Sequence, residues 1–456
     1  MRRVVKVSRI RIIITIIVVV LTTLLTGCTG KEPNEIAYVV ALGIDSTDDD
    51  NYKITIQYAN TTQISGGASE SGGKAGSEIV DNVTIEAPNI YAGVGLSNNR
   101  VSKSVSMSQA KLRVFSKEIA EKGVKDMIET LVRSEEIRPD VVIAEANTTA
   151  NDYLTSVNPE MEVNPAQYYQ LIYQKNQLVG IPDGQLREFF TGLYTDNYDS
   201  ILPVAGVIEG AGGNSQNDDK GQSKDGQNEG SEGSSESLDS FESKSSDDKD
   251  ENEKEKDAEK NTSKYEYDIK NYVGGETAIE KKNKAEAIGA AVFEKDKMVG
   301  ELGEVETEIC KILKGDYTYS YLTYYNNDTP DIPITVKTTQ QKKPKYKIDT
   351  DKKTVDIELY IESDLYSLPA DYNVENKIED FERDVANYTS SACTEFINNF
   401  TKKYNSDILK LNEKVKYKFL TNNQYNWFKK NVGWSEYKFS VCTNFKVRRT
   451  GWIVRE

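Results

Sequence analysis

Few side chains in this sequence can do chemistry, because its 456 residues include no histidine. Without histidine there is no Ser-His-Asp or Cys-His nucleophile system and no histidine-ligated metal site. There is also no CxxC pair, P-loop or GxGxxG segment. Chemistry that uses carboxylates alone stays open, but no pair stands out among the 73 acidic residues. We therefore expect no catalytic residues, no cofactor and no metal site.

The four cysteines fall into two groups. Cys310, Cys393 and Cys442 are odd in number, far apart and confined to the C-terminal half. They do not make a disulfide framework, so we interpret them as buried small apolar residues. Cys28 is different, because it follows an apolar run near the N-terminus.

The residues before Cys28 have the pattern of an export signal. Five basic residues, with no acidic residue among them, come first: Arg2, Arg3, Lys6, Arg9 and Arg11. Residues 12–25 are then aliphatic except for three threonines. A membrane-spanning helix needs roughly 20 apolar residues, whereas the apolar part of a signal peptide is shorter. We expect residues 1–27 to be a cleaved signal peptide; an uncleaved membrane helix is the alternative.

The end of this segment, Leu25-Thr26-Gly27-Cys28, resembles the bacterial lipobox. The resemblance implies cleavage between Gly27 and Cys28, an S-diacylglycerol group on the Cys28 thiol, and an acyl chain on its freed amine. Two or more acyl chains are enough for stable attachment to a membrane. We therefore expect an extracytoplasmic chain that lipid on Cys28 holds to a membrane surface.

The charge balance restricts the partners of the chain. Its net charge is −16. The charged residues of the expected signal are all basic, so cleavage would make the chain more negative. Such an acidic chain binds nucleic acid poorly and is repelled by anionic lipid. We expect no nucleic-acid partner and no membrane attachment other than the lipid on Cys28.

Composition predicts three regions after the signal. Residues 28–209 show alternating strand and helix patterns, which predicts a mixed α/β region. Residues 210–263 hold 16 acidic residues and 7 lysines but only four apolar side chains. Such a segment buries too little surface to offset its ordering entropy, so we expect 210–268 to be a disordered acidic linker or insertion. Residues 269–456 are expected to form a C-terminal α+β domain.

Hydrophobic periodicity places the elements of the first region. Strands are expected at 35–43, 52–59, 79–86, 110–115, 141–146 and 201–208, and helices at 88–96, 117–132, 166–177 and 184–194. The first two strands form a hairpin around the acidic stretch 45–51. This stretch lacks the glycine and the final glutamate of an EF-hand loop, so we expect a solvated turn.

The C-terminal region is predicted to be an antiparallel sheet backed by helices. A hairpin at 288–294 and 297–299, a helix at 301–313, strands at 332–338, 343–348, 354–361 and 437–447, and one long helix at 372–404 are expected. The long helix has apolar residues at spacings of three and four: Val374, Ile378, Phe381, Val385, Tyr388 and Ala392. This seam is expected to pack on the helix's own sheet; docking to a partner is the alternative. The fold class is therefore α+β.

Four stretches, in order along the chain, resemble the spore germination lipoprotein family. They are Cys28 with NEIAYVVALGID at 34–45; EIAEKG at 118–123 with LVRSEEIR at 131–138; AAVFEKDKMVGELGEVET at 290–307; and the aromatic stretch from Trp427 to Val447. The chain departs from the family pattern at Thr29-Gly30-Lys31, where a tryptophan is usual, and at Lys117, where a glycine is usual. The family is the C subunit of nutrient germinant receptors, also written Ger(x)C.

The resemblance implies a non-enzymatic subunit that acts in spore germination. Family members are lipid-anchored on the outer face of the spore inner membrane, beside the integral-membrane A and B subunits. Two other classes stay open: a lipid-anchored solute-binding protein, which needs a cleft between two similar lobes, and an anchored enzyme, which needs two acidic side chains buried together. Arg133 and Arg138 are expected to form salt bridges within the chain rather than an interface.

Overall fold

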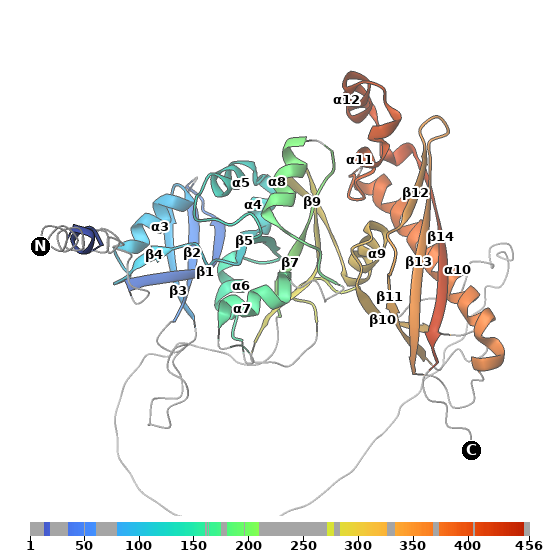
Figure 1. Ribbon diagram of the computed structural model, residues 1–456, viewed down its shortest axis with the longest axis horizontal. Coiled ribbons are helices and arrows are strands. Elements are labelled where there is room, and N and C mark those ends of the chain that lie inside the picture. Colours follow the sequence, from blue (N-terminus) through green and yellow to red (C-terminus); the bar gives the residue numbers. More distant parts are fainter. Residues whose placement is uncertain are drawn as a thin grey trace, which may run out of the picture. The chain divides into compact units, whose positions relative to one another are not determined.

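The structure is a computed structural model with two β-sheets and their associated helices, which confirms the expected α+β class (Figure 1). It describes residues 13–18, 35–49, 51–60, 80–159, 162, 164–174, 180–195, 197–208, 271–277, 283–325, 333–367, 374–404 and 406–450. The acidic segment expected at 210–268 lies outside the described residues.

In the described chain, nine strands form the first sheet, in the order β3-β2-β1-β5-β6-β7-β8-β9, with β4 beside β1. Their bounds are β1 Ile36–Ser46, β2 Tyr52–Ala59, β3 Val80–Ala87, β4 Ser104–Ser106, β5 Leu112–Ser116, β6 Val142–Ala146, β7 Ile201–Val207, β8 Ala285–Glu294 and β9 Lys297–Leu302. β1, β5, β6 and β7 run parallel, and both ends of the sheet are antiparallel. The mixed sheet expected for the N-terminal region is confirmed.

Helices cover both faces of this sheet, because its central strands bury side chains on both sides. Their bounds are α3 Ile90–Asn98, α4 Lys117–Lys122, α5 Lys125–Val132, α6 Ala150–Ser156, α7 Pro165–Tyr169 and α8 Leu186–Thr195. Ile44 and Phe115 belong to a core cluster with residues of α3, α4, α5 and α8. Ala41 and Val114 belong to a second cluster with residues of α6 and α7. The result is a three-layer arrangement (Figure 1).

The helix predicted at 117–132 is divided into α4 and α5. Gly123 between them has φ of 124°, a backbone conformation that glycine adopts without steric cost. The Val124 amide then donates to the Asp296 carbonyl at 2.9 Å instead of continuing the helix. The helical period of the apolar residues survives the break, because all of them still face the same core cluster.

The hairpin β8–β9 belongs to the first sheet. The sequence-based boundary puts it in the region 269–456, whereas Ala285 to Val292 pair antiparallel with β7. The acidic segment is thus an insertion between two neighbouring strands rather than a separator of sheets. A long insertion is tolerated there, because the entropy of closing a loop grows only slowly with its length.

The second sheet contains five strands in the described chain, in the order β10-β11-β13-β12 with β14 also on β13. The elements are α9 Glu304–Lys314, β10 Tyr319–Tyr325, β11 Pro333–Thr339, β12 Lys345–Asp349, β13 Thr354–Ser367, α10 Val374–Tyr404 and β14 Lys438–Arg449. β14 runs parallel to β13, so the sheet is mixed where an antiparallel one was expected. A parallel pair requires a long crossover, and α10 lies in the connection.

The long helix α10 packs against β14, which confirms the expectation that its seam faces its own sheet (Figure 1). Phe381 and Val385 are buried, and the Phe381 and Phe445 ring centroids lie 6.4 Å apart. β14 alternates buried and exposed side chains along its length. Cys442 is on the exposed side of this alternation, so its predicted burial is wrong, whereas the burial of Cys310 and Cys393 is confirmed.

Between α10 and β14 the described residues form two short α-helices, α11 Leu411–Val415 and α12 Asn422–Asn431. A row of aromatic rings in contact holds this part together. Phe419 packs against Phe428, Phe428 against Trp434, and Trp434 against Tyr437, in tilted or edge-to-face arrangements. The indole of Trp434 donates to the Asn412 side chain at 3.3 Å. The row therefore connects α11, α12 and the start of β14.

The acidic stretch expected at 45–51, which begins within β1, is not entirely solvated. Asp45 is buried, and its carboxylate accepts from the Ala150 amide at 2.6 Å and from the Asn151 amide at 3.0 Å. These are the first amides of α6, which have no partner within the helix. Asp45 therefore fixes the start of α6 on the first sheet, and the expectation of a solvated turn is wrong for this residue.

Candidate functional site

Cys28 lies outside the described residues, so its predicted lipidation stays a prediction. None of the helices in the described part of the chain combines the length and the apolar character needed to cross a membrane.

A network of polar contacts forms a junction between two parts of the chain that are far apart in sequence. One part is helix α8 with the loop to β7, and the other is the segment from Asp407 to α12. The junction residues are Glu188, Asn197, Tyr198 and Asp199 from the first part and Asp407, Lys410, Tyr425 and Lys429 from the second.

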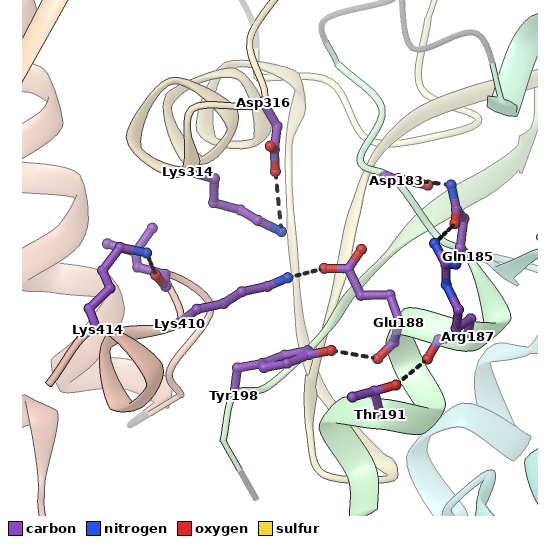
Figure 2. A network of polar contacts seen from close by, with 11 residues as sticks. Asp183, Gln185, Arg187, Glu188, Thr191, Tyr198, Lys314, Asp316, Lys410 and Lys414 are labelled. Atoms are coloured by element: carbon purple, nitrogen blue, oxygen red, sulfur yellow. Dashed lines mark hydrogen bonds and ion pairs between the residues drawn. The ribbon is translucent and has the colours of Figure 1, made fainter. Parts of the chain in front are cut away.

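Lys410 is at the centre of the junction. Its ammonium group pairs with the Glu188 carboxylate and lies 4.4 Å from the centroid of the Tyr198 ring. Tyr198 in turn donates its hydroxyl to the Glu188 carbonyl at 2.9 Å, so the three residues form a closed set (Figure 2). A carboxylate and an aromatic face are both favourable partners for one cation.

The backbone turn that carries Lys410 is held by Asp407. Lys410 has φ of 57°, a left-handed conformation that is costly for a residue with a Cβ. The buried Asp407 carboxylate accepts from the Leu411 amide at 2.7 Å and the Asn412 amide at 2.8 Å, which caps α11. Capping of this kind offsets the strain at Lys410.

Asp199 joins this turn to the first sheet. Its carboxylate accepts from the Asp407 amide at 2.8 Å and from the Lys295 amide, in the β8–β9 turn, at 3.2 Å. The Asp199 amide also donates to the Asp407 carbonyl at 3.2 Å. One aspartate therefore links three separate stretches of chain.

Helix α12 makes a further set of contacts with the same loop. Tyr425 donates its hydroxyl to the Asn197 side chain at 3.2 Å, and Lys429 donates to the Asn197 side chain at 3.0 Å and the Thr195 carbonyl at 2.9 Å. Lys429 also lies 5.0 Å from the Tyr425 ring centroid. The segment from Asp407 to α12 is thus attached to the first part of the chain near both of its ends.

The pKa values of the two carboxyl groups Asp407 and Glu188 shift in opposite directions. Burial raises the pKa of Asp407 to about 7, against the two amides that lower it. Burial also opposes ionisation of Glu188, but Lys314 and Lys410 together lower its pKa. Burial raises the pKa of Tyr198 to about 12. Glu188 is therefore the charged partner of Lys410 at neutral pH, whereas the pKa of Asp407 is itself close to neutral pH.

A polar cleft of 610 Å³ opens beside the junction. Its lining includes Tyr198, Asp199, Lys295, Asp407, Lys430 and Trp434. The carboxylates of Asp199 and Asp407 already accept backbone amides. The arrangement suits holding the segment in place.

Other candidate residues from the sequence are placed apart from the junction. Within the described residues, no three Cys, Asp or Glu side chains gather as a metal site. Burial raises the pKa of Cys310 to about 11 and of Cys393 to about 12, which suppresses the reactive thiolate. Arg133 pairs with Glu129 at 3.0 Å and Arg138 with Asp140 at 2.9 Å, which confirms salt bridges within the chain.

The junction was not predicted from the sequence. Its partners are separated by about 200 residues, and no local pattern pairs Glu188 with Lys410. One local signal was available, because Asp407 stands four residues before Leu411 in a stretch that breaks the helical period after α10. Aspartate before a short helix is a capping signal.

Two family models match the chain. The model described as "Spore germination protein N-terminal domain" matches residues 30–207, and the one described as "Spore germination B3/ GerAC like, C-terminal" matches residues 288–451. The second match begins within β8, so the junction contains residues from both matched segments.

Individual proteins are similar to this chain as well. The spore germination protein KC of Bacillus subtilis (strain 168) is 25% identical over 174 residues, which is 35% of this chain and 42% of that protein. The matched stretch thus spans less than half of the length of this relative. The crystal structure of the GerBC protein matches with a TM-score of 0.47 and 15% identity, over 89% of this chain and 96% of that one. The chain belongs to the Ger(x)C family of spore germination proteins.

Proposed function

We propose that the chain is a non-enzymatic subunit of a nutrient germinant receptor, held by lipid on Cys28 at the outer face of the spore inner membrane. The observation that carries the proposal is the pair of family matches, at 30–207 and 288–451, directly behind a lipobox-like segment. The proposed partners are the integral-membrane A and B subunits of the receptor.

The lipid gives this subunit its access to those partners. A protein confined to the membrane meets an integral-membrane protein at a much higher effective concentration than a free one. A weak contact between folded surfaces is then sufficient for assembly. The acidic balance of the whole chain, −16, makes general attraction to an anionic bilayer a poor substitute for the lipid.

A role without catalysis agrees with the chemistry of the side chains. The chain has no histidine, and Cys310 and Cys393 are buried thiols with raised pKa values. The carboxylates of the junction are bound to amides and to Lys410. These groups support a fixed arrangement of the chain.

The solute-binding alternative receives less support. A cleft is present beside the junction, but that class needs two similar lobes around it. In the described chain the first sheet has nine strands with a parallel centre, and the second has five around β13. The two halves are therefore unlike in topology.

Deletion of the gene followed by two germination assays tests the proposal. Spores without the protein should fail to respond to the nutrients of its receptor while still germinating with calcium dipicolinate, which bypasses the receptor. A normal response to every nutrient that triggers germination of the parent strain would contradict it.

A further inference from the structure

We propose that an exposed surface of α12 and the turn before it is a second membrane contact, which docks on an anionic bilayer surface. We name it the α12 patch: a groove lined by Lys418, Phe419, Leu420, Asn423, Gln424 and Trp427, with Tyr417 beside it in sequence. The proposal stands on this surface alone and does not depend on lipid at Cys28.

The α12 patch exposes large apolar side chains that a soluble surface normally buries. Leu420 is 95% exposed, Tyr417 79% and Trp427 69%. Single exposed apolar residues are common, but a tryptophan and a leucine that line one open groove are a contiguous apolar surface. Such surfaces in proteins are sites of contact with another surface.

The exposed side chains belong to a well-supported part of the fold and not to a chain end. Phe419 is held from below by the rings of Tyr425 and Phe428, at centroid distances of 5.9 and 4.9 Å. Thr421 caps the N-terminus of α12, because its side chain accepts a hydrogen bond from the Gln424 amide at 3.3 Å. The junction contacts of Tyr425 and Lys429 then fix the opposite side of the helix. The backbone that carries Trp427 and Leu420 is thus held in place by these contacts.

Charge distinguishes the α12 patch from the rest of the chain. Residues 411–434 contain five lysines and one glutamate, in a protein with a net charge of −16. Lys418 donates to the Ile348 carbonyl, and Lys416 lies 5.9 Å from the Tyr425 ring centroid, so these contacts leave their positive charge in place. Lys430 is three residues from Trp427, which makes the two neighbours on the helix surface.

The combination of side chains fits a lipid surface. Tryptophan and tyrosine prefer the interface between headgroups and acyl chains, where one end of the side chain is wet and the other apolar. Lysines around them are attracted to anionic headgroups. A leucine beside them adds apolar area that enters the upper part of the bilayer. The proposal departs from the sequence-based expectation that lipid on Cys28 is the only membrane attachment of this acidic chain.

The test uses the full chain in vesicles of phosphatidylcholine with or without phosphatidylglycerol, with a brominated phosphatidylcholine as the fluorescence quencher. The chain has three tryptophans, so the signal of Trp427 is the difference between the parent chain and Trp427→Phe. We expect this signal to shift to the blue and to be quenched in anionic vesicles. The triple variant Lys416→Gln, Lys418→Gln, Lys430→Gln should lower the ratio of docked to undocked patch about 100-fold, at about fivefold per charge.

The matched control moves the tryptophan to another exposed aromatic position. Tyr366 on β13 is 59% exposed, so Tyr366→Trp in the Trp427→Phe background tests whether any exposed ring is quenched. Equal quenching at both positions, or none at Trp427, overturns the proposal. A third outcome would also overturn the proposal. If lipid does not quench Trp427, but the spore's integral-membrane proteins shield it from iodide, the α12 patch binds a protein partner instead.

Discussion

The side-chain amide of Asn398 binds both backbone groups of Phe439, donating to its carbonyl at 3.0 Å and accepting from its amide at 3.1 Å. Asn398 is on α10 and Phe439 is near the start of β14, whose strand partner is β13. Three further acceptors on α10 continue the pattern, since Thr394 accepts from the Val441 amide and Ser390 and Glu382 from the amides of Thr443 and Val447. The helix therefore satisfies the free edge of the strand, which would otherwise be open to pairing with another chain.

Asn398→Ala should lower the free energy of unfolding by about 1–3 kcal/mol, because it leaves two buried backbone groups without partners. Urea unfolding measures the change. Asn399→Ala is the matched control, since Asn399 is the next residue on the helix and is exposed. Equal effects of the two substitutions would show that the contact with Phe439 does not stabilise the strand.

The ion pair at the junction should couple Glu188 and Lys410 energetically. A double-mutant cycle with Glu188→Gln and Lys410→Met is expected to give a coupling of about 0.5–1.5 kcal/mol, because each side chain is only about a third exposed. The exposed pair Asp380 and Arg383 on α10 is the control and should couple by less than about 0.5 kcal/mol. A coupling at the junction no larger than in the control would mean that this pair does not hold the segment.

Stability should depend on pH through Glu145. Burial and the nearby charge of Glu301 raise its pKa from 4.5 to about 8, and its carboxylate has no hydrogen-bond partner among the described residues. The folded state therefore keeps the proton up to a higher pH than the unfolded state does. The stability from this group is complete below pH 4.5 and falls as pH rises to about 8.

Glu145→Gln cannot ionise, so the variant should gain about 1–3 kcal/mol over the parent chain between pH 5 and pH 8. Urea unfolding at the two pH values measures this difference. The exposed Glu135→Gln is the control and should show no such gain. A parent chain and Glu145→Gln variant that keep the same stability difference at both pH values would contradict the prediction.

Local patterns were sufficient for most elements of the fold. Strand β2 and helix α10 follow from alternation and helical period, and β1 follows from its continuous apolar run, because these patterns depend on how an element is buried and not on what buries it. The break at Gly123 and the parallel pairing of β14 depend on contacts across the chain, with Asp296 and with β13. A single sequence does not contain that information in its periodicity.

The short elements were missed for the same physical reason. Helix α6 has seven residues, which is below the length at which a helix is stable by itself. It is fixed by Asp45, which is 105 residues away along the chain. The junction is similar, because Glu188 and Lys410 have no pattern of their own and acquire their role when the first and last parts of the chain meet. The exposed α12 patch was missed because exposure is not a property of the sequence alone.

Cys28 remains the residue on which the functional account depends most. The direct measurement is nutrient germination of spores that carry Cys28→Ala, with the amount of protein in the spore matched to the parent strain. We expect loss of the protein from the inner-membrane fraction and loss of the nutrient response, while germination with calcium dipicolinate stays normal. A Cys28→Ala protein that stays with the membrane and supports a normal nutrient response would contradict it.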